Sequence, residues 1–438
     1  MPLRDFGSTK AFFMLYASIA FSGLATPRPV RANPEPPGVY GARASAMAGA
    51  VVADVADGSS MYHNPAGLAN LQSLNLSLAA TPLLVRYNAP LAGPGSERDS
   101  GPIIAPLLMV GGGYRVHRRL TLGVGAYVQT GFGGGFQDVP VVGPYDQVEL
   151  DKPQDQTVVL VVWELATAAA FNISDQLRVG ISARLPFARQ EVSMHQEILP
   201  DLWQPVDQSV RGVGIPGVLL GLQYEPHPRV HLGFVYRSKT YIDMSGTTKF
   251  ALSSFGNQLS FDTNARWNVP HMIRGGGAFH FLNERLIVTV EGRVQFHREA
   301  NRRQIFRLPD VPIESLNAIN VPFDWKNVYQ GLMGAEFWVI PNIALRVGAS
   351  AGNSATPSST HSVFTPPPGY QLGAYGGIGL RTDSFDVGGA FSWGGGRASV
   401  SNNHPQNCAE NSQLKFGCAG DYRVDSYFFT IGINYFLD

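Results

Sequence analysis

The pair of residues best spaced for acid–base chemistry is Glu291 and Arg293, two positions apart in an alternating segment. A carboxylate beside a guanidinium can act as a general acid or base, but it is more often a packed ion pair. The sequence contains no His-Glu-x-x-His metalloprotease motif and no P-loop. We therefore predict that the protein is not an enzyme and needs no cofactor, with a lipase as the remaining enzymatic alternative.

The two cysteines, Cys408 and Cys418, lie ten positions apart in one polar stretch near the C-terminus. In an exported protein this spacing favours a local disulfide, and two free thiols are the alternative. His404 is the nearest metal-ligating side chain, but three candidate ligands in one loop are weak evidence for a zinc site. We expect a disulfide and no metal site.

The overall composition excludes several classes of protein. The 33 basic and 33 acidic residues cancel, so no basic excess favours nucleic acid as a partner. Charged residues make up only 15% of the chain against a usual ~25%. Since 44% of the residues are hydrophobic, the chain also lacks the composition of a disordered protein.

The first 32 residues have the pattern of a signal peptide. Arg4 and Lys10 form a basic region, residues 11–25 are apolar, and residues 30–32 offer a small-x-Ala cleavage site. A retained membrane anchor is the alternative, although the apolar stretch is shorter than the ~20 residues that a spanning helix needs. We predict export of a mature chain that begins near residue 33.

The remaining chain is dominated by period-2 alternation, which is typical of strands with one apolar and one polar face. Residues 427–436 and 286–296 are clear examples, and no uncharged apolar run of 18 or more residues follows residue 32. In a membrane barrel the polar face lines the lumen. The charged residues that we expect there are Arg178, Arg184, Glu291 and Arg293.

The links between these segments alternate between short and long, which is typical of outer-membrane barrels. The predicted strands cover residues 73–88, 104–115, 120–131, 156–172, 177–190, 213–224, 229–246, 265–281, 285–298, 327–338, 343–352, 371–381, 385–394 and 426–436. Long links are expected between them at 191–212 and 395–425, among others. We predict an all-β fold, a 14-stranded antiparallel transmembrane barrel formed by residues 73–438 in the bacterial outer membrane.

Residues 33–72 precede the first strand and lack sustained alternation. They are rich in Gly and Ala and contain the tripeptide Asn64-Pro65-Ala66. Pro65 fixes its own φ and Asn64 can hydrogen-bond within its turn, so the tripeptide suits a tight turn, in a hatch or in an ordinary loop. This segment resembles the start of the FadL-type transporters of long-chain fatty acids and their toluene-uptake relatives.

The resemblance implies a barrel closed by an N-terminal hatch and a passive uptake function. Its implied partners are a hydrophobic small molecule and the outer-membrane lipids, and we expect a monomer. The implied route runs from the extracellular loops to an apolar pocket beside the hatch, and then sideways through a gap in the wall. A long-chain fatty acid is the expected ligand. The alternatives are an aromatic hydrocarbon channel of the same family and a general diffusion porin.

Overall fold

The computed structural model describes residues 40–91, 94–101, 103–139, 154–199, 202–251, 258–401 and 419–437. The predicted signal peptide and the predicted disulfide between Cys408 and Cys418 lie outside these residues.

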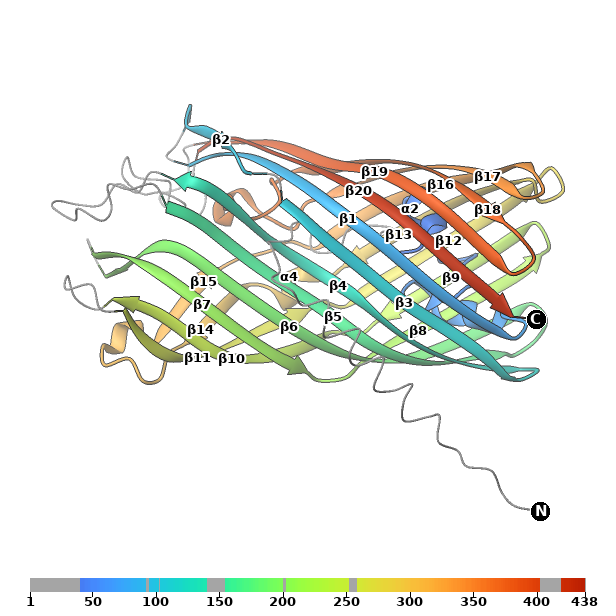
Figure 1. The fold of residues 1–438 in the computed structure, drawn as a ribbon, viewed down its shortest axis with the longest axis horizontal. Coiled ribbons are helices and arrows are strands. Elements are labelled where there is room, and N and C mark those ends of the chain that lie inside the picture. The colour runs from blue at the N-terminus through green and yellow to red at the C-terminus, as the bar shows by residue number, and fades with distance from the viewer. Residues whose placement is uncertain are drawn as a thin grey trace, which may run out of the picture.

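The described residues form a closed antiparallel barrel of fourteen strand positions, as the alternation predicted (Figure 1). The ring closes where β1 pairs with β20, from Leu74 opposite Leu437 to Asn88 opposite Arg423. In order around the barrel, the strands are β1 (Leu74–Pro90), β3 (Ile103–His117), β4 (Leu120–Val139), β5 (Gln154–Asn172), β6 (Leu177–Leu199), β8 (Gly217–His227), β9 (Val230–Arg237), β12 (Met272–Phe281), β13 (Leu286–Gln295), β16 (Val328–Ile340), β17 (Ile343–Asn353), β18 (Tyr370–Arg381), β19 (Phe385–Val400) and β20 (Gly420–Leu437).

Three of these positions continue beyond a short break. They are extended by β7 (Leu202–Gly214), β10 (Thr240–Ala251) and β11 (Gln258–Val269), and β7 pairs with both β6 and β10. The predicted long link at 191–212 is therefore wrong, because β6 and β7 pair there as a hairpin out to Leu199 and Leu202. The paired strands extend further toward the long-loop end of the barrel than the segments in which apolar and polar residues alternate.

The two faces of the wall are inverted relative to a soluble protein. Large apolar side chains such as Val290 and Ile431 are exposed, at 46% and 62%. Their neighbours Thr289 and Glu291 are buried inside the ring. This arrangement suits a barrel whose outer face contacts lipid.

Residues 40–71 lie inside the ring, at the end with the short turns (Figure 1). They include α2 (Ala42–Ala46), α3 (Ser60–His63) and the 3₁₀ helix η1 (Pro65–Asn70). We call these residues the hatch segment. Its backbone touches the backbone of the wall: a Cβ on Gly180 of β6 would lie 2.4 Å from the backbone nitrogen of Ala66. No helix among the described residues is long and apolar enough to cross a membrane.

The link between β13 and β16 covers the other half of the lumen. It contains α4 (His297–Ala300), β14 (Arg303–Arg307), η2 (Glu314–Leu316) and β15 (Ala318–Pro322), and β14 pairs with β11. Gln304 exchanges hydrogen bonds with Gln190 of β6. The link to β18, with η3 (Ser358–Thr360), is also buried, as Val363 and Phe364 show.

Candidate functional site

The wall is interrupted between β3 and β4. Their pairing ends at Met109 opposite Tyr127. Beyond this point β4 continues to pair with β5, as far as Val139 opposite Gln154. Within the described residues, the far half of β4 therefore has no ladder on its β3 side.

The same part of β4 turns into the barrel. Residues 129–136 are all buried, so the alternation of exposure stops there. A bulge at Gln129 shifts the register against β5, and bulges bend a strand. Gly133 has a φ of 150°, a conformation that side chains rarely adopt. The Gly-Phe-Gly-Gly-Gly run at 131–135 thus permits the bend.

This inward turn brings Phe132 into a cluster of four aromatic rings, which we call the aromatic chamber. The ring centroid of Phe132 lies 5.2 Å from that of Trp267 on β11 and 5.7 Å from that of Trp325. Phe323 completes the cluster, 5.1 Å from Trp325. All four side chains are at most 5% exposed. The four rings pack against one another in edge or tilted contact, so the chamber is an apolar cluster of side chains.

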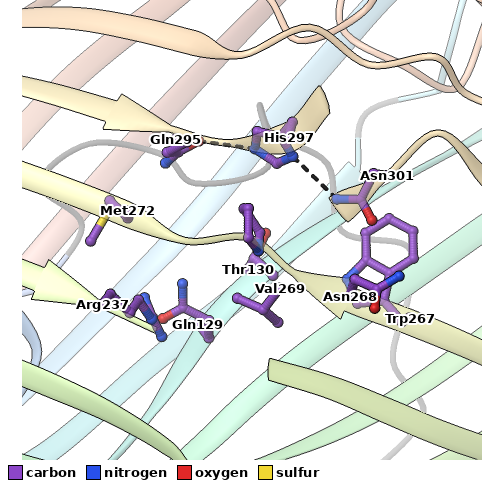
Figure 2. A pocket seen from close by; sticks show the side chains of 11 residues that line it. Gln129, Thr130, Arg237, Trp267, Asn268, Val269, Met272, Gln295, His297 and Asn301 are labelled. Atoms are coloured by element: carbon purple, nitrogen blue, oxygen red, sulfur yellow. Dashed lines mark hydrogen bonds between the residues drawn. The ribbon is translucent and has the colours of Figure 1, made fainter. Parts of the chain in front are cut away.

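A small cavity of about 10 Å³ adjoins the chamber, enough for about one water molecule. Figure 2 shows its lining, where His297 bridges Gln295 and Asn301 and where Arg237 lies close to Gln129. Trp267 forms the chamber side of this lining. A ligand of more than a few atoms needs movement of the surrounding side chains.

Two polar atoms of the chamber have no hydrogen-bond partner among the described residues. They are the indole N–H groups of Trp267 and Trp325. A buried indole N–H normally finds an acceptor, and an unsatisfied one costs about 1–3 kcal/mol. Both donors are therefore available to an acceptor that a ligand brings into the chamber.

Below the chamber, buried ion pairs cross the lumen. The Glu164 carboxylate lies 2.8 Å from an Arg184 nitrogen and 2.6 Å from an Arg237 nitrogen, and it accepts a hydrogen bond from Tyr127. Nearer the short-turn rim, Glu291 lies 2.6 Å from Arg274. We call Glu164, Arg184, Arg237, Arg274 and Glu291 the ion-pair layer.

The structure places the four charged residues predicted for the lumen in different surroundings. Arg184 and Glu291 belong to the ion-pair layer. Arg293 is 3.7 Å from Glu291, too far for a hydrogen bond. Arg178 lies at the rim and pairs with Glu225 at 2.7 Å. The predicted pair of Glu291 and Arg293 is thus less close than the pair with Arg274, which the sequence did not suggest.

The hatch tripeptide contacts the wall through Asn64. Its amide donates to the carbonyl of Leu222 on β8 at 3.1 Å and to that of Val52 at 2.7 Å. Its side-chain oxygen accepts from the Ala66 N–H, and Pro65 begins η1. The tripeptide therefore links the two parts of the hatch segment to each other and to the barrel.

Burial also fixes the protonation of a hatch histidine. Burial, reinforced by the Arg274 guanidinium, lowers the pKa of His63 to about 3. Its neutral ring lies 2.9 Å from the carbonyl of Tyr40, so the Nε2–H donates to that oxygen. The Tyr40 hydroxyl in turn donates to the carbonyl of Val128, at the point where β4 leaves β3. The hatch segment is thus connected to the wall interruption.

Two short stretches match spacings that enzymes use, but neither has the required local structure. Residues 348–352 read Gly-Ala-Ser-Ala-Gly, yet they lie within β17, whereas a nucleophilic serine of this type needs a strand-to-helix turn. Residues 212–217 match Gly-x-Gly-x-x-Gly, but β8 follows instead of a helix. These matches support no enzymatic site.

A model of the outer-membrane transport protein family (OMPP1/FadL/TodX) matches residues 38–436. The chain belongs to this family. As a member of this family, it is an outer-membrane β-barrel protein. The family predicted from residues 33–72 is therefore confirmed.

Solved structures of the FadL/TodX family share the fold. A FadL homologue of Pseudomonas aeruginosa is 15% identical, with 94% of this chain and 100% of that chain covered and a TM-score of 0.70. The toluene transporter TbuX of Ralstonia pickettii is 18% identical, with 92% and 99% covered and a TM-score of 0.70. The toluene transporter TodX of Pseudomonas putida is 15% identical, with 91% and 99% covered and a TM-score of 0.70.

Among curated proteins, an outer-membrane protein of Neisseria meningitidis serogroup B is 33% identical over 105 residues. That match spans only 22% of this chain and 22% of the relative. It therefore adds a local likeness to the family assignment.

Sequence reasoning missed the aromatic chamber and most of the ion-pair layer. Trp267 and Glu164 lie in predicted strands, but nothing local showed what they would meet across the lumen. The break in alternation at residues 129–136 was the available signal for the wall interruption. Its five-residue Gly-Phe-Gly-Gly-Gly run was included in part in a predicted strand ending at 131.

Proposed function

We propose that this protein carries hydrophobic small molecules passively across the outer membrane, with long-chain fatty acids as its ligand class. The aromatic chamber is the observation that carries the proposal, because it lies directly beside an interruption in the barrel wall. The protein acts as a monomer surrounded by outer-membrane lipid, and no covalent chemistry is involved.

Apolar burial supplies the driving force for entry. A methylene group gains about 0.8 kcal/mol when it leaves water for an apolar site. The chamber offers four aromatic rings for this purpose, whereas a water-filled channel would offer no such gain. The small cavity volume indicates that the ligand opens the chamber by displacing side chains.

The route leaves through the wall. The hatch segment and the ion-pair layer fill the axis of the barrel below the chamber. Among the described residues, the far half of β4 has no ladder on its β3 side, so its separation from β3 breaks no strand hydrogen bonds there. A ligand that enters from the long-loop end therefore passes sideways into the lipid more readily than straight down.

The free indole donors favour fatty acids over plain hydrocarbons. A carboxyl group can accept from Trp267 and Trp325, and a toluene molecule cannot. Uptake of an aromatic hydrocarbon is the second candidate, supported by the ring-lined chamber itself. A diffusion porin fits poorly, because the described hatch segment occupies the lumen.

Vesicle transport tests the proposal. Purified protein is placed in liposomes, and the entry of radiolabelled oleate, of toluene and of a small sugar is compared with entry into empty liposomes. We expect faster oleate entry at an unchanged sugar rate. Rapid sugar swelling would indicate a porin, and toluene entry without oleate entry would assign the hydrocarbon ligand.

A further inference from the structure

A cluster of two histidines and a carboxylate joins the hatch segment to the wall near the short-turn rim. His231 lies on β9, His280 on β12, and Asp54 in the hatch segment. One ligand atom from each lies within 4.8 Å of those of the other two. The function proposed above does not use this cluster.

The strand register places the two histidines together. His231 is paired with Ala278, so His280 is its diagonal neighbour on the same inward face. The two ring centroids are 4.3 Å apart. The Asp54 Oδ1 atom lies 3.4 Å from His231 Nδ1 and 3.9 Å from His280 Nε2, so it approaches both rings.

His280 lacks a hydrogen-bond partner at the nitrogen that faces this centre. Its side chain is only 9% exposed, and Nε2 is unsatisfied among the described residues. Buried polar atoms are rarely left in this state. The nitrogen lone pair can point into the space beside a carboxylate oxygen. A metal ion would occupy that space and bind both atoms.

The outer contacts of the cluster suit a metal site. Asp54 uses its other oxygen, Oδ2, to bind Arg43 at 2.6 Å, which leaves Oδ1 directed at the histidines. The second nitrogen of His231 lies 3.8 Å from Glu225, whose carboxylate is fixed by Arg178. A carboxylate behind a ligating histidine is the usual outer-shell arrangement.

We propose that Asp54, His231 and His280 bind a divalent transition-metal ion of the zinc class and thereby attach the hatch segment to the wall. Zinc accepts imidazole and carboxylate ligands at about 2.0–2.2 Å, which sets its ligand atoms about 3.3–3.5 Å apart. The distance from Asp54 Oδ1 to His231 Nδ1, 3.4 Å, already has this value. Side-chain rotation of His280 brings the third ligand in, and the partial exposure of Asp54 and His231, 16% each, leaves room for a water ligand.

Bound metal has a mechanical consequence for the hatch segment. Asp54 is the hatch member of the cluster, and both histidines belong to the wall, so the ion bridges the two parts. An ion that binds only this arrangement favours it over any in which the hatch segment has moved. Metal availability would therefore set how readily the hatch segment leaves the wall.

Metal binding to the full-length mature protein tests the proposal. Untagged protein in detergent is stripped with a chelator and dialysed against Zn²⁺, and the bound metal is counted by elemental mass spectrometry. We expect one ion per chain. We expect His231→Ala and His280→Ala each to weaken binding at least tenfold. Co²⁺ should give an absorption spectrum typical of nitrogen and oxygen ligands in the unmodified protein and not in these two variants.

The matched control is His227→Ala, which removes an exposed histidine from the same rim. Binding in this control should equal that of the unmodified protein. Each variant is first shown to be folded by its faster migration on an unheated gel. Zn²⁺ should also protect residues 40–71 from protease in the control but not in His280→Ala. Absence of binding by folded unmodified protein, or equal binding in the His280→Ala variant, would overturn the proposal.

Discussion

The two halves of the lumen differ in what fills them. Toward the short-turn rim, inward strand residues form the ion-pair layer, in which Glu164 and Glu291 are contacted by arginines on more than one strand. Toward the long loops, Phe132 and Trp267 from the strands and two residues of the link between β15 and β16 form the aromatic chamber, whose two indole N–H groups have no partner among the described residues. One barrel can thus combine a lumen half held by buried ion pairs with a half held by contacts between aromatic rings.

The difference follows from the strength of the contacts. Buried charge pairs are lost at a high cost because each partner is then left uncompensated. Contacts between apolar rings are individually weak and lack strict direction, so the rings can rearrange around a ligand. The half that blocks the axis is therefore stiff, and the half that we propose receives the ligand is adaptable.

The largest expected effect comes from removing the hatch segment. Deletion of residues 40–66 should leave a folded barrel with high ion conductance and no selective fatty acid uptake, because a polar ring without its filling is open to water. Conductance in planar bilayers and oleate uptake measure this. Unchanged conductance and uptake would contradict the role of the hatch segment in closing this half of the lumen and would favour a porin.

Loss of one charge from the ion-pair layer should have the next largest effect. Glu164→Gln leaves Arg184 and Arg237 buried without a counterion, and we expect unfolding free energy to fall by about 3–5 kcal/mol. Urea unfolding in detergent provides the measurement. The control Glu191→Gln breaks the partly exposed pair with Arg189 and should cost less than about 1 kcal/mol. Equal effects would show that burial of the layer does not matter.

Acid should loosen the hatch segment through His63. Its pKa of about 3 in the folded protein is below the ~6.5 of an unfolded histidine, so the unfolded state binds the extra proton first. The stability that neutral His63 contributes is thus fully present above pH ~6.5 and is lost as the pH falls toward 3. At pH 5 the loss in unfolding free energy is about 2 kcal/mol. His63→Gln should remove this part of the difference between pH 7 and pH 5 in urea unfolding. The exposed His117→Gln should retain it, and an identical slope in both variants would reject the assignment.

The smallest effect concerns the chamber. Trp267→Phe keeps an aromatic ring and removes an N–H that has no partner among the described residues. The desolvation cost that is recovered offsets the packing lost with the smaller ring, so stability should change little. Oleate binding should weaken about tenfold, the equivalent of one hydrogen bond to a charged acceptor, while toluene binding stays the same. Competition with a fluorescent fatty acid measures the affinities. Trp163→Phe, on the outward face of β5, is the control, and an equal loss there would remove the polar role of Trp267.

The sequence predicted the barrel because alternation is a local property. Strands such as 343–352 and 385–394 could be recognised from their own residues, and the lumen side of Arg184 followed from the same pattern. The partners of these residues depend on register and ring closure. Glu164 meets Arg237 across several strands, and no local pattern encodes that distance.

The hatch contacts were hidden for a related reason. Asp54 approaches His231 and His280 only after the hatch segment has been placed inside the ring, and their positions in the chain are far apart. Cys408, Cys418 and His404 are neighbours along the chain, and proximity along the chain does not reveal ligands that only folding brings together. The disulfide between those cysteines stays a prediction.

The contact of Gly180 with the Ala66 backbone limits how this protein can be recombined with its relatives. A side chain on that wall residue would occupy the space of the hatch backbone, since its Cβ would lie 2.4 Å from the Ala66 nitrogen. In a chimera that joins this hatch to a foreign barrel with a bulkier residue at the matching place, the hatch would not fit against the wall, even if both parent proteins fold well. Hatch and wall are thus not interchangeable parts, and any exchange of one has to carry the facing glycine of the other with it.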